Sequence, residues 1–251
     1  MILKTEENLW LQDIKKTDFL FLIVKSTAVC ILIAYIFYGS ILSALFLLPV
    51  WILYTRDGLY DLCRKKKQEF RIQFRNAIQA MGAALKVGYS VENAIREAEK
   101  DLASMYEEDV RIRKEYSKMV HQLDMKMAAV NVMEQFSERM KQEDTSDFVT
   151  VFSSAKASGG DSIAIIRNAV KMISEKIETE QEIQTMIASK KLEFEIMCSV
   201  PFFIILYMKV TFGEFLNVLY GNILGISFMT ICLIVYMGAY RFGKKIIRIE
   251  V

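Results

Sequence analysis

The chain has 251 residues, 53% of them hydrophobic, and a formal net charge of +2 at pH 7. Residues 56–195 hold 23 of the 32 Lys and Arg residues and 24 of the 30 Asp and Glu residues, whereas residues 26–55 and 215–240 hold none. Apolar ends around a charged middle exclude an ordinary soluble globule. They predict an all-α integral membrane protein with a central domain in water.

The first apolar stretch runs from Phe19 to Tyr54 and is interrupted only by Lys25. A spanning helix needs about 20 apolar residues, so this stretch is too long for one crossing. It divides naturally at Tyr38-Gly39-Ser40. We predict a cytoplasmic segment over residues 1–18 and a transmembrane hairpin of two spans over residues 19–55. One tilted span followed by an interfacial helix is the alternative.

A second pair of spans is predicted over residues 196–240, with its turn near residues 213–222. Lys and Arg gather on the cytoplasmic side of a membrane. Basic clusters flank both pairs of spans: Lys15, Lys16, Arg64, Lys65, Lys66, Lys67, Lys190, Lys191, Arg241, Lys244, Lys245 and Arg248. Both termini, with the tail 241–251, and the central domain 56–195 are therefore predicted to be cytoplasmic. Arg64–Lys67 are predicted topology anchors beside anionic lipid.

The central domain is predicted to be an antiparallel bundle of about six helices. Apolar residues recur there at three- and four-residue steps, and no alternation of period two indicates a sheet. The first helix passes through Phe70 and Leu85 and stops at Gly88. Ser90 can cap the second helix, which runs from Val91 to about Tyr106.

The remaining helices of the domain follow the same rules. The third is expected around residues 109–122, the fourth over 125–140, and the fifth, with N-cap candidates at 144–147, to about residue 157. Gly159-Gly160 ends the fifth helix, and Asp161 or Ser162 begins the sixth. No Pro or Gly occurs from Asp161 to Val200, so nothing stops the sixth helix before the third span.

Several of these positions together resemble the F-domain of type II secretion systems. Residues 83–95, AALKVGYSVENAI, resemble its helical hairpin with Gly88 and Ser90 at the turn. The same order continues with Phe136-Ser137-Glu138-Arg139, Asp147-Phe148 and Gly159-Gly160-Asp161. The resemblance covers about residues 70–247. A single domain flanked by hairpin spans is most similar to the TadB/TadC branch, the inner-membrane platform proteins of Tad-type pilus machines.

This resemblance implies a non-enzymatic platform. Its cytoplasmic domain would contact a hexameric secretion ATPase, and its spans would contact pilin subunits in the bilayer. The general secretion F proteins carry two copies of the domain, so a sister subunit, identical or paralogous, would complete the unit. The alternative function is a membrane receptor or signalling adaptor with a cytoplasmic helical bundle.

The residues themselves give no pattern for catalysis. His121 is the only histidine, the four cysteines are scattered singly, and no phosphate-binding loop, nucleophile elbow or His-Glu-x-x-His motif occurs. The central domain has 23 basic and 24 acidic residues, without the positive excess that nucleic-acid binding requires. We predict no enzyme activity, no cofactor, no metal site and no nucleic-acid partner.

One charge pattern is a candidate interface with the ATPase or a sister subunit. An acidic block precedes a basic one: Glu97, Glu99, Asp101, Glu107, Glu108 and Asp109, then Arg111, Arg113, Lys114 and Lys118. Mixed charge on exposed helices offers partners to a soluble protein. A solvated helix face with weak internal pairs is the alternative.

Overall fold

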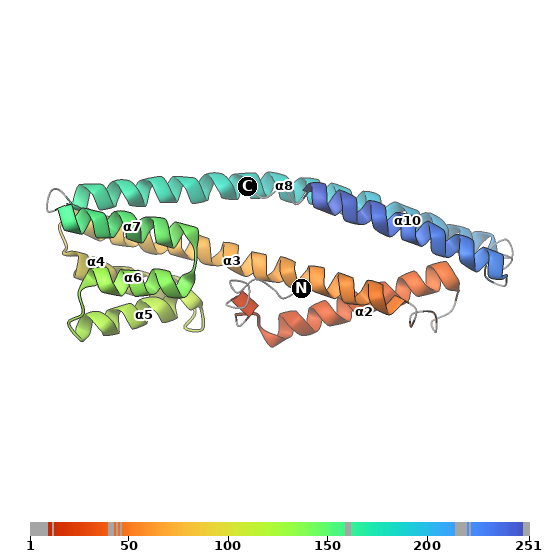
Figure 1. Cartoon of the computed structure of the whole chain (residues 1–251), viewed down its shortest axis with the longest axis horizontal. Helices are drawn as coiled ribbons and strands as arrows, with labels where there is room; N and C mark the ends of the chain where they lie inside the picture. Colours follow the sequence, from red (N-terminus) through yellow and green to blue (C-terminus); the bar gives the residue numbers. More distant parts are fainter. Residues whose placement is uncertain are drawn as a thin grey trace. The chain divides into compact units, whose positions relative to one another are not determined.

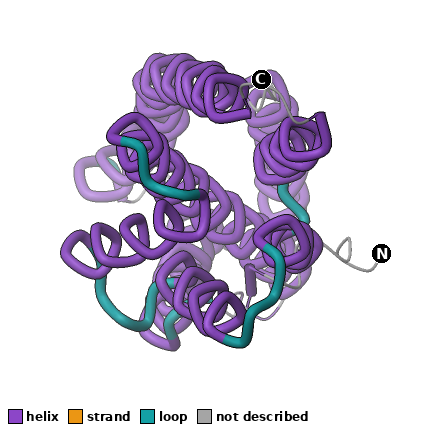
Figure 2. Tube along the Cα trace, turned by 90° about the vertical axis from the view of Figure 1, so that its left-hand side faces the viewer, coloured by secondary structure: helices purple, strands orange, loops and turns teal. Residues whose placement is uncertain are grey.

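The computed structural model describes residues 10–11, 13–39, 43, 45, 47–158, 162–213, 220 and 222–247, and these form helices joined by loops (Figures 1 and 2). The helices are α2 (Lys16–Tyr38), α3 (Leu48–Val87), α4 (Val91–Met105), α5 (Arg111–Asp124), α6 (Ala129–Met140), α7 (Glu143–Ser158), α8 (Ser162–Thr211) and α10 (Ile223–Ile247). The chain forms two compact units. The first combines residues 1–14 with 63–180, and the second combines residues 15–62 with 181–251.

Aromatic side chains fill the core of the first unit. Phe74 of α3 is fully buried, and the rings of Phe136 on α6 and Phe148 on α7 lie with their centroids 6.0 Å from its own. Apolar residues at three- and four-residue steps predict a packing seam on the sixth helix at Ile163, Ile166, Val170, Ile173 and Ile177. The last four are buried, whereas Ile163 is exposed. The three- and four-residue spacing therefore identified the core-facing side of this helix correctly.

The turn between α3 and α4 has the predicted geometry. Gly88 adopts a left-handed conformation with φ of +97°, which glycine reaches without the steric cost that a Cβ imposes. The backbone N–H groups of Gly88 and Tyr89 donate to the carbonyls of Leu85 and Ala84. The Ser90 hydroxyl accepts a hydrogen bond from the Asn93 N–H at 3.3 Å. The prediction of a glycine stop followed by a serine cap is confirmed.

Two predicted helix starts differ from the structure. The fourth helix of the domain, α6, begins at Ala129 rather than Met125, because Lys126 adopts a left-handed conformation with φ of +66° after α5. The N-cap prediction for α7 was wrong. This helix begins at Glu143, so Asp144–Asp147 lie inside its first turns.

Helix α8 runs without interruption from Ser162 to Thr211 and contains Pro201. The expectation that the sixth helix continues into the third predicted span is therefore confirmed. The glycine pair before it, with Asp161, lies outside the described residues.

The N-terminal segment packs on the first unit. Trp10 is 4% exposed, and its ring centroid lies 5.2 Å from that of Phe70 on α3. Arg111 of α5 lies over the Trp10 ring, 5.4 Å from its centroid, and donates hydrogen bonds to both carboxylate oxygens of Asp13. These contacts join residues about 60 and 100 positions apart, so local periodicity gave no sign of them.

Three described helices are long and apolar enough to cross a membrane: Lys16–Tyr38, Ile163–Thr211 and Leu224–Ile247. They correspond to the first, third and fourth predicted spans. Helix α3 is not among them, because its apolar part before Arg56 covers only its first eight residues. The second predicted span therefore stays a prediction.

Polar contacts join the helices of the second unit. Lys209 of α8 donates a hydrogen bond of 2.6 Å to the carbonyl of Tyr35 near the end of α2. Tyr236 of α10 donates one of 2.6 Å to the Cys198 carbonyl, close to Pro201 in α8. Lys244 of α10 lies 3.4 Å from a carboxylate oxygen of Asp57 and equally far from one of Asp61 on α3.

Candidate functional site

The residues of the predicted charged interface lie on α4, on the loop after it and at the start of α5. Glu97 pairs with Lys100 at 2.8 Å. Arg111 binds Asp13, and Arg113 donates to the Tyr106 carbonyl at 3.0 Å. The acidic side chains on the surface are those of Asp101, Glu107, Glu108 and Asp109, with Glu99 partly exposed. The fold thus uses Arg111 and Arg113 internally, whereas Lys114 and Lys118 are exposed, so the surface carries charges of both signs.

We define the acidic loop as residues 107–109, between α4 and α5. Tyr106, the residue before it, accepts a hydrogen bond of 2.7 Å on its hydroxyl from Asn76 of α3. This bond ties Tyr106 to Asn76 of α3. All three members of the loop are exposed.

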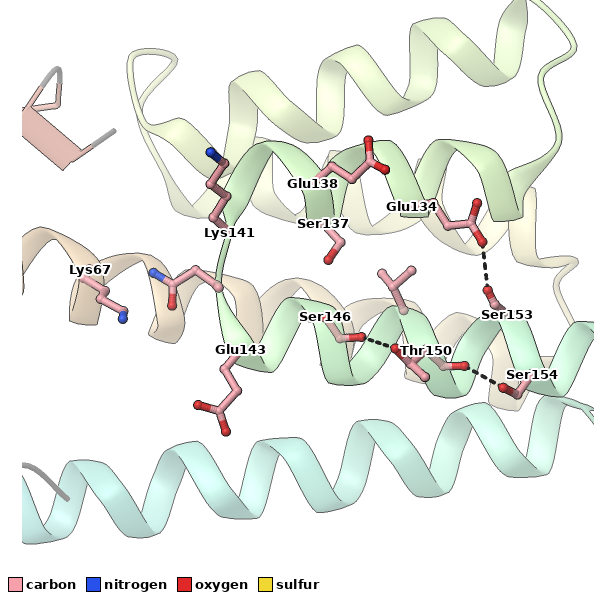
Figure 3. A pocket seen from close by; sticks show the side chains of 12 residues that line it. Lys67, Glu134, Ser137, Glu138, Lys141, Glu143, Ser146, Thr150, Ser153 and Ser154 are labelled. Carbon is pink, nitrogen blue, oxygen red and sulfur yellow. Dashed lines mark hydrogen bonds between the residues drawn. The ribbon is translucent and has the colours of Figure 1, made fainter. Parts of the chain in front are cut away.

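A groove that the sequence analysis did not find lies between α6 and α7 (Figure 3). Its volume is about 850 Å³. Its walls carry mainly hydroxyl, amide and charged side chains: Lys67, Glu134, Ser137, Glu138, Lys141, Gln142, Glu143, Ser146, Val149, Thr150, Ser153 and Ser154. No local sequence pattern predicts such a groove, because its walls come from the outward sides of two helices and from one residue of α3.

Charges of both signs line the groove. Lys67, Lys141 and Glu143 lie at one end, and Glu134 lies at the other, where it accepts a hydrogen bond of 3.1 Å from the Ser153 hydroxyl (Figure 3). Lys67 belongs to the predicted topology anchors on α3, so one of these four basic residues lines the groove. Lys141 ends α6 in a left-handed conformation with φ of +50°.

Gln142, between α6 and α7, is the buried polar residue of this groove. It is 3% exposed, and its carbonyl accepts hydrogen bonds from the Ser146 N–H and the Thr145 hydroxyl. Its side-chain Nε2 is buried and has no hydrogen-bond partner among the described residues. A buried amide that donates no hydrogen bond is costly and uncommon in folded proteins.

A network of charges beneath the groove holds the start of α7. Asp144 is 2% exposed and contacts Arg71 of α3 at 2.5 Å and Lys176 of α8 at 3.1 Å. Arg71 also pairs with Glu180 of α8. Burial raises the pKa of the Asp144 carboxyl, but hydrogen bonds and attraction from Arg71 and Lys176 outweigh it and hold this pKa below its ordinary value.

A second buried carboxylate holds α6, the other wall of the groove. Glu115 of α5 accepts hydrogen bonds from Arg139 of α6 at 2.7 Å and from Lys118 at 2.9 Å. Burial raises the pKa of Glu115, and the two basic partners more than offset it, so the pKa lies below its ordinary value. Both walls are thus fixed to α5, α3 or α8 by ion pairs.

No group of three or more His, Cys, Asp or Glu side chains in the described part of the chain is arranged to hold a metal ion. The groove instead presents hydrogen-bonding groups and opposite charges along one surface. Such a surface suits recognition of a polar segment of a partner.

The described residues form a helical protein, in which one group of helices shares a hydrophobic core and three helices are long and apolar enough to cross a membrane. The family described as "Type II secretion system (T2SS), protein F" matches residues 68–208, more than half of the chain. The chain belongs to this family, whose members are membrane platform proteins, generally without enzymatic activity, that work with secretion ATPases and other platform subunits. No curated protein and no solved structure matches the chain.

Proposed function

We propose that the chain is a platform subunit of an inner-membrane machine of the Tad type, which assembles pili. In this role it couples a cytoplasmic secretion ATPase to the extraction and assembly of pilin subunits. The observation that carries the proposal is the family match over residues 68–208. That range includes α4 to α7 of the bundle and most of α8, which continues from Ser162 into an apolar segment.

The assignment to the TadB/TadC branch is part of this proposal. It is supported by a single matched range that includes most of α8, with its apolar segment, and that is followed by the apolar helix α10. A second subunit, identical or paralogous, that completes the platform is part of the same proposal.

The N-terminal contacts support cytoplasmic termini. Trp10 and Asp13 pack on the same unit as α4 to α7, so this segment and the bundle lie on one side of the membrane. The chain between Ile14 and Cys63 must then cross an even number of times. Helix α2 is one crossing, and the predicted second span is the return. The apolar parts of α8 and α10 form the second pair and bring the tail back.

The charged surface of α4, its loop and the start of α5 is the candidate contact for the ATPase or for a sister subunit. An ATPase ring that approaches from the cytoplasm meets exposed charges there, and complementary charge raises both the rate and the specificity of association. The continuous helix α8 would carry the resulting displacement toward the bilayer.

The test is co-purification of the full-length protein, in detergent, with candidate secretion ATPases and sister subunits encoded beside it. We expect one ATPase to be retained, and we expect E107K/E108K/D109K to weaken the retention of the ATPase or of the sister subunit. E175K/E178K is the matched control, because it reverses two exposed charges on α8. Retention of neither an ATPase nor another platform protein would contradict the proposed function.

A further inference from the structure

Helix α8 contains a proline inside its apolar part. Pro201 has no backbone N–H, so the carbonyl of Met197, one turn earlier, loses its usual helical partner. Prolines are the commonest places at which a long helix bends, yet α8 continues without interruption from Ser162 to Thr211. The contacts around Pro201 therefore decide how firmly the two parts of α8 are joined.

The neighbouring helix α10 binds the turn that Pro201 weakens. The Tyr236 hydroxyl donates a hydrogen bond of 2.6 Å to the carbonyl of Cys198, within the turn that ends at the proline. The ring of Tyr236 meets that of Phe202, directly after the proline, with centroids 5.1 Å apart and planes at 90°. A hydroxyl from a neighbouring helix is one of the groups that stabilise the backbone around a proline in an apolar helix.

A second contact lies before the proline in the sequence. One turn further along α10, the Tyr240 ring stacks on Phe194 of α8, with centroids 5.8 Å apart. The two helices approach closely at this point, because a Cβ at Gly243 would overlap the Phe194 ring. Helix α10 therefore contacts α8 on both sides of Pro201.

Helix α10 is itself held in place by α2 and α3. Lys244 lies 3.4 Å from a carboxylate oxygen of Asp57 and equally far from one of Asp61 on α3. Nearer the start of α10, the Thr230 hydroxyl shares a hydrogen bond of 3.1 Å with the hydroxyl of Tyr38 on α2. These contacts make α10 a fixed support for α8.

We propose that α8 has a hinge at Pro201 and that α10 holds this hinge closed through the Tyr236 hydroxyl. With the hinge closed, α8 moves as one rod from its buried seam to its apolar part. When Tyr236 leaves the Cys198 carbonyl, the part of α8 before Pro201 bends away from α10, and the two parts move separately. Tyr236 is thus a positioning residue for α8. The hinge does not depend on the proposed function, and only its effect on filament assembly rests on it.

The first test measures the distance between α8 and α10 in the full-length protein, in detergent, by pulsed EPR. Spin labels are attached to M186C and I246C, at exposed positions of α8 before the hinge and of α10, in a chain whose four cysteines are replaced by alanine. About 15 residues separate the first label from the hinge, or about 22 Å of helix. A bend of about 20° would then move this label by about 8 Å.

We expect Y236F to lengthen and broaden this distance, because it removes the hydroxyl and keeps the ring. Labels at V210C and L224C, both exposed and both beyond the hinge, should keep their separation. Y240F is the matched control, since it changes another tyrosine of α10 and keeps the ring that stacks on Phe194. An unchanged distance in Y236F, or an equal increase in Y240F, would overturn the proposal.

P201A provides a readout that a merely structural role of Tyr236 would not move. Alanine restores the N–H that the Met197 carbonyl lacks, so the helix no longer depends on a contact from α10. We expect P201A to keep the short distance, and Y236F to have little effect on it in the P201A chain. Lengthening by P201A alone, or an equal effect of Y236F with and without Pro201, would overturn the hinge.

Filament assembly in cells separates the hinge from the proposed function. We expect Y236F to lower assembly several-fold at an unchanged protein level, and P201A/Y236F to recover it. A longer distance in Y236F with normal assembly would support the hinge and contradict the proposed coupling through α8. Reduced assembly with an unchanged distance would contradict the hinge and leave the proposed function in place.

Discussion

Two buried carboxylates form ion pairs between the helices of the first unit. Glu115 and Asp144 are almost fully buried, and each contacts two basic side chains. A buried pair adds little net stability compared with apolar packing, but removal of one partner leaves an uncompensated charge. We infer that these pairs fix the register of α5 on α6 and of α7 on α3 and α8.

Glu115→Gln tests this role. We expect a loss of about 1–3 kcal/mol of bundle stability at pH 7, measured by hydrogen exchange at the α5 amides of the full chain in detergent. The pKa of Glu115 lies below its ordinary value of 4.5 when folded. The stability that ionised Glu115 contributes to the fold is therefore complete above pH 4.5. It is lost as the pH falls through the lower pKa that Glu115 has in the folded state. The difference between wild type and variant should shrink over that range.

Glu138→Gln is the matched control for this measurement. Glu138 is exposed on α6, next to the residue that binds Glu115. Its substitution should change the stability by less than about 0.5 kcal/mol. A difference between wild type and E115Q that stays constant down to pH 3 would contradict the assignment.

At the scale of elements, the turn between α3 and α4 depends on its glycine. A Cβ at Gly88 would meet no atom within 4 Å, but the φ of +97° disfavours any side chain. Gly88→Ala should therefore cost about 1–2 kcal/mol through backbone strain alone, seen as a lower melting temperature in detergent. Val87→Ala, at the exposed neighbouring position, should be nearly neutral. Equal melting of both variants would show that the turn tolerates a Cβ.

Helix α8 is the element proposed to carry displacement toward the membrane. Ala188 and Ser189 lie on its exposed surface, between its buried seam and Pro201. Glycine at both positions lowers helix propensity by up to about 1 kcal/mol each without removing a core contact. We expect assembly of the exported filament to fall several-fold in cells while the protein level is maintained. Ser189→Ala, which favours the helix, should leave assembly unchanged, and normal output from the double glycine variant would refute the role of α8.

At the scale of the whole molecule, the number of crossings sets the topology. Reporters fused at the N-terminus, in the loop 106–110 and at the C-terminus should all report the cytoplasm. Reporters in residues 40–47 and 213–222 should report the opposite side. Three crossings instead of four would place the N-terminus opposite the bundle, and this outcome would also conflict with the contacts of Trp10 and Asp13.

The helices of the bundle could be predicted because their signals are local. The spacing of apolar residues on α3 and α8 reflects the helical period, and Gly88 with Ser90 marks a turn through the conformations that those residues prefer. The start of α7 could not be placed in this way. The sequence predicts Asp144 as a helix N-cap. In the structure Asp144 lies inside the helix, and its carboxylate forms ion pairs with Arg71 and Lys176 from distant parts of the chain.

The family match confirms the F-domain that was recognised from the order of glycine, serine and aromatic positions. The sequence predicted only in part which charged residues of the candidate interface are exposed. The acidic residues of the loop are exposed, whereas Arg111 binds Asp13 and Arg113 binds the Tyr106 carbonyl. Charge patterns in sequence do not distinguish residues that face solvent from those that pair within the fold.

By itself, the sequence determined that this is a helical protein with apolar ends, a charged middle and an F-domain, because hydrophobic period, turn residues and charge segregation are properties of neighbouring residues. Only the tertiary structure decided which side chains meet. The attachment of Trp10 to α3, the buried pairs of Glu115 and Asp144, and the groove that contains Gln142 depend on contacts between residues far apart along the chain, and local preferences do not encode such contacts.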